Sequence, residues 1–561
     1  MKQILSNFFK QNISNNNNMY RKPISTKKNK VILYSIFFFC ALVISITLSG
    51  CCTNDLNNIN VFSTYISTEP SNLDPARGVD VNEAVIQSRI FDGLVRYNEK
   101  MELVPDLAES WTVSEDGCEF IFNLRKDVTF HNGQEFTAED VVFSLDRILD
   151  PNTASPRTWV LEKIAGASER MKGESEKTSG INALDKYRVS IRLNEPFAPF
   201  MSLLTTPACY ILPSKSKDTF KSSDFFDKPV GTGPFFVKDR VRDSYIHLAV
   251  NEKYFLGKPK VDNMLVRIIP ENLKAELEFE CDSIDLLQLY PSNFNRFRDN
   301  EKYRNRIVNV PALNVWYIGF NNQAEPFNNV KIRKALNLLI DREKIIEAIY
   351  SGRAVPAIGS IPPGISGYNS ADTGIGFKPE EGLKLLAEAG YNKDNPLKFE
   401  LYQKNQQSAF EITRFIQGEL KKYNVIIETK PMEWSALKDA INKGEAKAFF
   451  MNWFGDYPDG ENFLNPLFHS KNWGSGGNRA KFKNDEVDAL IEEAVKITDE
   501  NLRSQAYDKI NRKVVEQAPW LYLWHCSETY VTSPRVKNID FYPMFFCDKG
   551  LNIELGVRNE E

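Results

Sequence analysis

Residues 31–48 form an uncharged, mostly apolar run that constrains the fold more than any other feature of the chain. The 50 residues up to Gly50 hold seven lysines and arginines and no acidic residue. A basic flank before such a run keeps the start of a leader inside the cell while the apolar segment enters the membrane. Only the chain after this segment is therefore expected to form a globular fold, outside the cytoplasm.

The small residues Ser49 and Gly50 come directly before Cys51 at the end of this run. That order resembles a bacterial lipoprotein signal, in which the chain is cut before the cysteine and the cysteine carries a lipid. The resemblance implies a mature protein that begins at Cys51 and is attached to the outer face of a membrane. An uncleaved signal anchor is the alternative, because the run approaches the length of a membrane span. Translation starts either at Met1 or at Met19.

The composition excludes several classes of protein. The leader contains none of the 74 acidic residues, so the rest of the chain has a surplus of acidic groups, which argues against nucleic acid as a partner. Hydrophobic residues make up 42% of the chain, enough for large cores and more than one lobe. The four histidines are widely separated, and zinc-hydrolase, nucleophile-elbow and phosphate-loop motifs are missing. We expect no enzymatic activity, metal or cofactor.

Hydrophobic periodicity predicts the mixture of strands and helices that is typical of an α/β protein. The expected strands lie at residues 61–67, 398–401 and 425–429 and in hairpins at 111–124 and 182–193. The expected helices lie at residues 84–97, 138–148, 330–350, 379–389 and 409–423. Thr137 is the predicted N-cap of the second helix, because acidic residues follow it in the first turn. The helix over 330–350 is either continuous or divided near Asp341.

Five motifs follow one another over most of the chain after residue 60. They are LDP at 73–75 with IFDGL at 90–94, the stretch LAESW to LDRILDP at 107–151, PVGTGPF at 229–235, FNNVKIRKALNLLID at 327–341 and WFGDYPDGENFLNPLF at 453–468. In content and order they resemble the family 5 extracellular solute-binding proteins, the oligopeptide and dipeptide receptors of ABC importers. The glycines of PVGTGPF are expected to form a tight turn without ligand contact, because glycine adopts backbone angles closed to other residues.

The resemblance implies an α/β protein with the two-lobed periplasmic-binding-protein-like fold, class II and of the large type, with an extra inserted subdomain. The expected parts are a signal peptide 1–50, a lipid-anchored tether 51–60, lobe I in 61–91 and 223–315, the inserted subdomain 92–222, lobe II 316–525 and a return to lobe I in 526–561. Crossovers between the lobes are expected near residues 314–321 and 524–530. Ligand binding would close the lobes by a hinge motion and create the surface that a permease recognises.

An aspartate among aromatic residues is the strongest candidate for ligand binding. Asp456 follows Trp453 and Phe454, and a carboxylate in such surroundings is costly unless a cation pairs with it. In peptide-binding members the aspartate at this position pairs with the free α-amino group of the ligand, which implies the same role for Asp456. Trp453 and Phe454 would then line the first ligand pocket. A solvated acid in a turn, or a calcium-like cluster with Asp459 and Glu461, is the alternative.

The resemblance also implies contributions from other parts of the cleft. Val79 and Val81 would form an opposing wall, since they follow the LDP motif. Dipeptide-binding members hold the ligand carboxylate with an arginine where this chain has Gln403, so a longer or variable-length peptide is expected. Lys404 is the neighbouring cation that could serve instead, although an exposed loop lysine is the simpler interpretation.

The resemblance implies a monomeric, lipid-anchored protein on the extracytoplasmic face of the cell membrane. It would bind short peptides and deliver them to an ABC permease powered by a cytoplasmic ATPase, without hydrolysing anything itself. The same fold with another solute, such as a nickel chelate, haem, an oligosaccharide or an opine, is the first alternative. An extracellular hydrolase with Asp456 and Asp459 as an acid pair, and a sensor or adhesin, are the others.

Overall fold

The structure is a computed structural model of the 561-residue chain and describes residues 60–78, 80–216, 228–474 and 477–556. These residues belong to one compact unit, Asn58–Glu561. The apolar run at 31–48, Cys51 and Val79 lie outside the described residues. None of the helices in the described ranges combines the length and the apolar composition that a membrane span requires.

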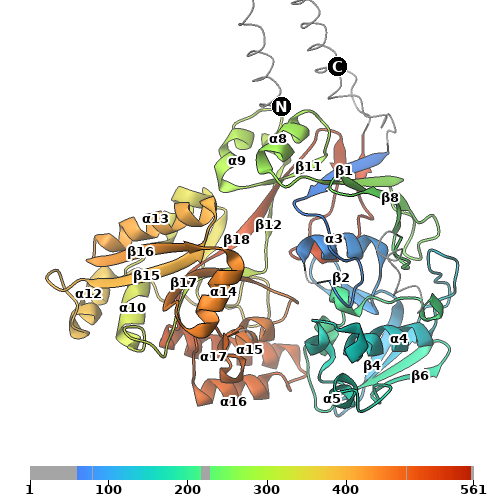
Figure 1. The fold of residues 1–561 in the computed structure, drawn as a ribbon, viewed down its shortest axis with the longest axis horizontal. Helices are drawn as coiled ribbons and strands as arrows, with labels where there is room; N and C mark the ends of the chain where they lie inside the picture. Colours follow the sequence, from blue (N-terminus) through green and yellow to red (C-terminus); the bar gives the residue numbers. More distant parts are fainter. Residues whose placement is uncertain (1–59, 79, 217–227, 475–476, 557–561) are drawn as a thin grey trace, which may run out of the picture. The chain divides into compact units, whose positions relative to one another are not determined.

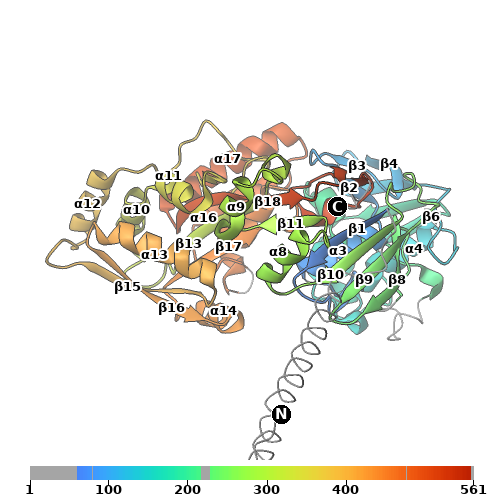
Figure 2. The same ribbon diagram turned by 90° about the horizontal axis from the view of Figure 1, so that it is seen from above.

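A four-stranded sheet joins two distant parts of the chain (Figure 2). Its order is β1 (Val61–Ile66), β10 (Asn263–Ile268), β9 (Tyr245–Val250) and β8 (Phe235–Val241). β1 runs parallel to β10, and the other neighbours are antiparallel. Helix α3 (Val81–Ile90) places Ile86 and Ile90 in the core of this sheet. The Asp80 carboxylate caps α3 by accepting the backbone N–H of Asn82 at 2.8 Å.

A second, antiparallel sheet contains both predicted hairpins. Its order is β4 (Ala108–Val113), β5 (Glu119–Leu124), β7 (Arg188–Arg192) and β6 (Ile181–Asp185). Helix α4 (Ala138–Leu149) packs on this sheet, and its Leu145 shares a core with Phe122 of β5 (Figure 1). The Thr137 backbone N–H donates to the Asp140 carboxylate at 2.8 Å at the start of α4. The predicted hairpins, helix and N-cap are confirmed.

The largest sheet has eight strands. Its path is β11 (Leu286–Leu289), β18 (Trp520–Thr532), β13 (Asn314–Phe320), β17 (Ala448–Phe454), β15 (Leu397–Lys404) and β16 (Val425–Met432), while β12 (Ile307–Pro311) and β14 (Ala354–Pro356) also pair with β18. β18 pairs with β13 and β14 through its first half and with β11 and β12 through its second. The two expected crossover segments lie in β13 and β18.

Helices cover both faces of this sheet. Side chains of α10 (Val330–Leu338), α12 (Pro379–Glu388) and α13 (Gln407–Lys421) share one core. Side chains of α14 (Trp434–Lys443), α15 (Glu461–Phe468), α16 (Asp485–Ala494) and α17 (Glu500–Gln517) share the other. In β17, Phe449 belongs to the second core and Phe450 to the first, as the alternation of a strand requires.

The remaining elements connect these layers. They are β2 (Val95–Tyr97), β3 (Leu103–Pro105), α5 (Ala167–Met171), α6 (Phe200–Leu203), α8 (Asn272–Glu280), α9 (Pro291–Arg298), α11 (Arg342–Ile345), β19 (Val536–Asn538) and β20 (Glu554–Leu555). The helix expected over 330–350 is divided into α10 and α11. Asp341 begins α11 by accepting the backbone N–H of Lys344 at 3.1 Å, so the divided form is the correct one.

The helix predicted over 84–97 is wrong in its second half. α3 ends at Ile90, and Phe91 is already extended, with φ −121° and ψ 161°. β2 then pairs with β3. Phe91 and Leu94 are almost completely buried, at 0% and 1% exposure. Their helical spacing misled the prediction because tertiary contacts, rather than one helix face, bury them.

The PVGTGPF turn packs against the end of α3. The Gly233 N–H donates to the Ile90 carbonyl at 2.8 Å, and a Cβ on Gly231 would lie 2.0 Å from that oxygen. Neither glycine has a positive φ. Glycine is thus needed here for the close approach of two backbones, not for unusual backbone angles, and the expected lack of ligand contact stays a prediction.

Candidate functional site

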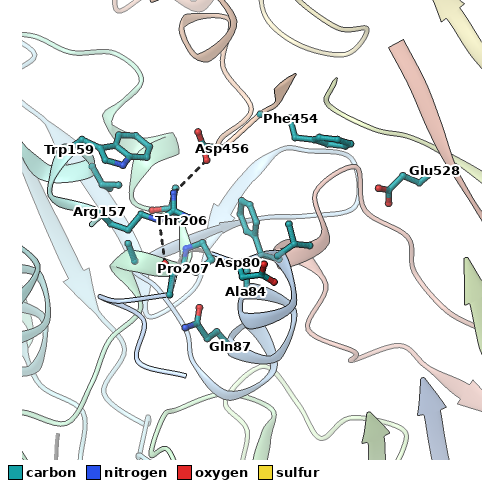
Figure 3. Close-up of a pocket in the computed structure, with 16 residues that line it drawn as sticks. Asp80, Ala84, Gln87, Arg157, Trp159, Thr206, Pro207, Phe454, Asp456 and Glu528 are labelled. Carbon is teal, nitrogen blue, oxygen red and sulfur yellow. Dashed lines mark hydrogen bonds and ion pairs between the residues drawn. The ribbon is translucent and has the colours of Figure 1, made fainter. Parts of the chain in front are cut away.

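A cavity of about 240 Å³, the first cavity, lies where distant parts of the chain meet (Figure 3). Its walls are the start of α3, the short helices η2 (Thr158–Leu161) and η3 (Pro207–Cys209), and the residues that end and follow β17. The charged lining residues are Asp80, Arg157, Asp456 and Glu528. Three carboxylates and one guanidinium therefore line this cavity.

Asp456 follows the end of β17, and the backbone fixes its position. The Gly455 N–H donates to the Leu313 carbonyl at 2.8 Å, and the Asp456 N–H donates to Oδ1 of Asn462 at 2.9 Å. The Asp456 side chain remains 37% exposed, on the cavity side. Burial raises the pKa of its carboxyl, and the charge of Arg157 opposes that rise. The site therefore holds a carboxylate that gains from a nearby cation.

Arg157 is the cation that lies closest to this carboxylate. Its Nη1 is 3.6 Å from Oδ1 of Asp456, and Figure 3 shows the two side chains directed toward each other. Its Nε donates to the Gly78 carbonyl at 3.3 Å. Arg157 thus connects the segment after β17 with the loop that precedes α3. Sequence analysis missed this residue, since it lies between residues 151 and 229, outside the five family motifs.

Two of the predicted wall residues line the first cavity. Phe454 and Val81 are 44% and 51% exposed and belong to its lining. Trp453 is outside the lining, because it packs against the core below β17 and its Nε1 donates to Oδ1 of Asn462 at 3.3 Å. Val79 lies outside the described residues. The ligand contacts expected of all four residues stay predictions.

The residues expected near the ligand carboxylate, Gln403 and Lys404, do not line the first or the second cavity. Lys404 is exposed at the end of β15 and lines neither of them. Gln403 is completely buried, and its side-chain amide has no hydrogen-bond partner among the described residues. The role expected of Lys404 therefore stays a prediction without support from these cavities.

Glu528 is a lining residue that the sequence motifs did not indicate. It lies in the second half of β18 and borders both the first cavity and a second cavity of about 230 Å³. The second cavity has walls from β1, α3, β11, β18 and residues 539–542, and Val81 also borders both cavities. Burial raises the pKa of the Glu528 carboxyl, which accepts a hydrogen bond from the Tyr530 hydroxyl. The two cavities therefore adjoin at Glu528.

The other acidic residues of the motif at 453–468, Asp459 and Glu461, do not face the first cavity. Asp459 is buried, accepts the Glu461 N–H at 2.9 Å and lies 3.8 Å from Nε of Arg503. Burial raises the pKa of Glu461 to about 7. Neither residue lines the first cavity. Among the described residues, no group of three His, Cys, Asp or Glu side chains is placed to hold a metal ion. The arrangement supports neither a calcium-like cluster nor an acid pair with Asp456.

Residues 102–475 match the family model for bacterial extracellular solute-binding proteins, family 5. The chain belongs to this family. The resemblance inferred from the five motifs is thereby confirmed. The members of this family are solute-binding proteins, and the family description calls them extracellular.

Relatives of this family 5 protein are named for different solutes. Heme-binding protein A of Haemophilus influenzae is 32% identical over 86% of this chain and 89% of its own length. The dipeptide-binding protein of Escherichia coli is 30% identical over 79% of this chain and 84% of its own length. The solved structure of HbpA2 from Haemophilus parasuis is 25% identical, with a TM-score of 0.77 over 89% of this chain and 100% of the other.

This family 5 protein has the two-lobed α/β fold, class II and of the large type, with an extra inserted subdomain. In the largest sheet, β18 pairs with β13 and β14 through its first half and with β11 and β12 through its second, and the crossovers between the lobes stay predictions. The exact domain boundaries stay predictions.

Proposed function

We propose that the protein captures short peptides in the first cavity, with the Asp456 carboxylate as the partner of the free α-amino group. The observation that carries this proposal is the position of Asp456, a half-exposed carboxylate in a cavity wall whose nearest cation is another side chain of the cavity. A ligand ammonium brings three donors to a carboxylate that burial otherwise penalises.

The shape and lining of the site suit a short peptide. The first and second cavities, about 240 and 230 Å³, adjoin and together reach the roughly 300–1,000 Å³ range of small-molecule sites. Phe454 and Val81 offer exposed apolar surface beside the carboxylate. A peptide can pair through its backbone while its side chains occupy such pockets, which allows many sequences to bind.

The proposed function extends to transport. Closure of the two lobes around a peptide would present a new surface to an ABC permease, and a cytoplasmic ATPase would supply the energy. A lipid at Cys51 would hold the protein, as a monomer, at the outer face of the membrane. The relative named as a dipeptide-binding protein supports the peptide as cargo, and no hydrolysis is proposed.

Haem is a second candidate, favoured by the relative named Heme-binding protein A. The described lining of the first cavity contains no His, Cys, Met or Tyr side chain that could be an axial ligand, whereas Tyr65, Tyr290, Tyr530 and Tyr542 line the second cavity. Mass spectrometry of small molecules released from the purified protein, with an absorption spectrum taken before release, separates the two. Short peptides of a narrow length range support the proposal, whereas bound haem overturns it.

The role of Asp456 is tested with Asp456→Asn. Loss of one charge-assisted contact should weaken the binding of trialanine roughly 10- to 100-fold and should leave N-acetyl-trialanine unaffected. Asp394→Asn, at an exposed loop position, is the matched control. Isothermal titration calorimetry measures all three proteins, and equal losses for both peptides would contradict the proposed clamp.

A further inference from the structure

Glu528 lies at the boundary between the two cavities and opposite Asp456. Figure 3 shows Asp456 beside Arg157 at one end of the first cavity and the Glu528 carboxylate at the other end, directed from β18 into the space beside Phe454. On its other side Glu528 borders the second cavity. A ligand that begins at Asp456 and extends into the second cavity therefore passes Glu528.

Among the described residues, the charge of Glu528 has no cation partner. Its carboxylate accepts a hydrogen bond from the Tyr530 hydroxyl and forms no ion pair with any Lys, Arg or His of the described ranges. Burial raises the pKa of this carboxyl. An unpaired carboxylate in a cavity wall is unfavourable until a cation arrives.

Most other charged residues at the two cavities already have a compensating charge or helix end. Arg89 lines the second cavity but forms an ion pair with the Asp548 carboxylate and also donates to the Asp548 carbonyl. Asp80 is exposed and caps the first turn of α3, where the helix dipole favours a negative charge. Asp540 accepts from the Asn552 side chain at 2.6 Å and borders the second cavity but not the first. Glu528 is thus the carboxylate that borders both cavities and forms no ion pair among the described residues.

The surroundings of Glu528 suit a long basic side chain. Tyr530 and Phe541 stack at 5.4 Å between ring centroids and line the second cavity together with Tyr542. Aromatic faces accommodate the aliphatic stem of a lysine or arginine and attract its charged end. Exposed Phe454 offers a similar surface on the side of the first cavity.

We propose that Glu528 is a specificity-determining residue that binds a second positive group of the ligand. The protein then prefers short peptides with a lysine, arginine or similar basic side chain over neutral peptides of the same length. This inference rests on the proposed peptide function, because Asp456 positions the first positive group and the peptide carries the second to Glu528.

The test compares tripeptides that differ in one charge. Alanine tripeptides with a single lysine at the first, second or third position are titrated calorimetrically against the matching norleucine peptides, which keep the aliphatic stem. The wild-type protein should bind at least one lysine peptide about tenfold or more tightly than its norleucine partner. Equal affinity at all three positions overturns the inference, whatever the behaviour of the variants.

The variant Glu528→Gln should abolish that preference, so that lysine and norleucine peptides bind it with similar affinity. Glutamine keeps the shape of the side chain and an oxygen that accepts from Tyr530, so the fold should be retained. Glu428→Gln, at an exposed position of β16, is the matched control and should keep the preference. A preference that survives in Glu528→Gln overturns the inference.

A diamine distinguishes this inference from the proposed function. 1,5-Diaminopentane carries two cations and no peptide group. If no peptide binds but the diamine binds to wild type and is lost in Glu528→Gln, the role of Glu528 stands and the peptide function fails. If neutral and lysine peptides bind equally, the peptide function stands and the role of Glu528 fails. If neither peptides nor the diamine bind, both fail.

Discussion

The guanidinium of Arg157 and the carboxylate of Asp456 lie 3.6 Å apart, from segments that are almost 300 residues apart in the sequence. The two side chains are 26% and 37% exposed. A partly solvated pair of this kind contributes about 0.2–1 kcal/mol. Arg157 therefore compensates the charge of Asp456 weakly in the free protein, and a ligand ammonium can share or replace this contact at small cost.

Replacing Arg157 with glutamine should strengthen the binding of trialanine by at most about fivefold, because the free protein loses its compensating cation. N-acetyl-trialanine should bind as it does to wild type. Arg188→Gln removes an exposed pair with Asp185 and is the matched control. Calorimetry at low salt measures the change. Weaker binding of trialanine to the variant would mean that Arg157 holds the ligand rather than competing with it.

The affinity for trialanine should fall as the pH is lowered, because burial raises the pKa of Asp456 above its ordinary value of 3.8. A peptide α-amino group stays protonated below about pH 7.7, so Asp456 is the partner that changes. The carboxylate is charged above its raised pKa, and the contact is lost as the pH falls through it. Calorimetry from pH 7 to pH 4 checks this. N-acetyl-trialanine is the control, and parallel pH profiles for the two peptides would contradict the prediction.

Local sequence patterns predicted the elements whose stability is largely local. The hairpin around β4 and β5 and the capped helix α4 follow from alternation and from Thr137 with Asp140. The failure at β2 has a tertiary cause, since the chain after Ile90 is buried by distant segments. Propensity and periodicity do not contain that information.

The sequence predicted only the part of the candidate site that the family motifs indicate. The family motif indicated Asp456, and the structure places it in the wall of the first cavity. Strand alternation separates its neighbours, since Trp453 packs on the same side of β17 as Met451, while Phe454 lines the cavity. Glu528 could not be found, because only the pairing of β18 with strands far away in the sequence brings it to the boundary of the two cavities.

A buried cluster connects the chain after α3 with the C-terminal segment. The Lys549 ammonium donates to the Asp92 carboxylate and lies 3.6 Å from the Asp106 carboxylate. Thr232 and Tyr254 donate to Asp92 at 2.7 and 3.0 Å. Burial raises the pKa of Asp106 to about 7, and the Lys549 charge opposes that rise. Lys549 therefore pairs with both buried carboxylates, and Arg96 lies 3.8 Å from Asp106 as a second cation.

Replacing Lys549 with methionine should lower the free energy of unfolding by about 3–5 kcal/mol, because Asp92 stays buried without its cation and Asp106 keeps only Arg96, whose Nε is 3.8 Å away. Lys260→Met removes an ion pair whose side chains are 48% and 44% exposed and should cost less than about 1 kcal/mol. Urea denaturation followed by tryptophan fluorescence measures both. The deficit of Lys549→Met should be smaller at pH 5.5 than at pH 8, since protonation of Asp106 below its raised pKa removes one of the two buried negative charges. Similar losses for the two lysine variants, or a deficit independent of pH, would contradict the role assigned to Lys549.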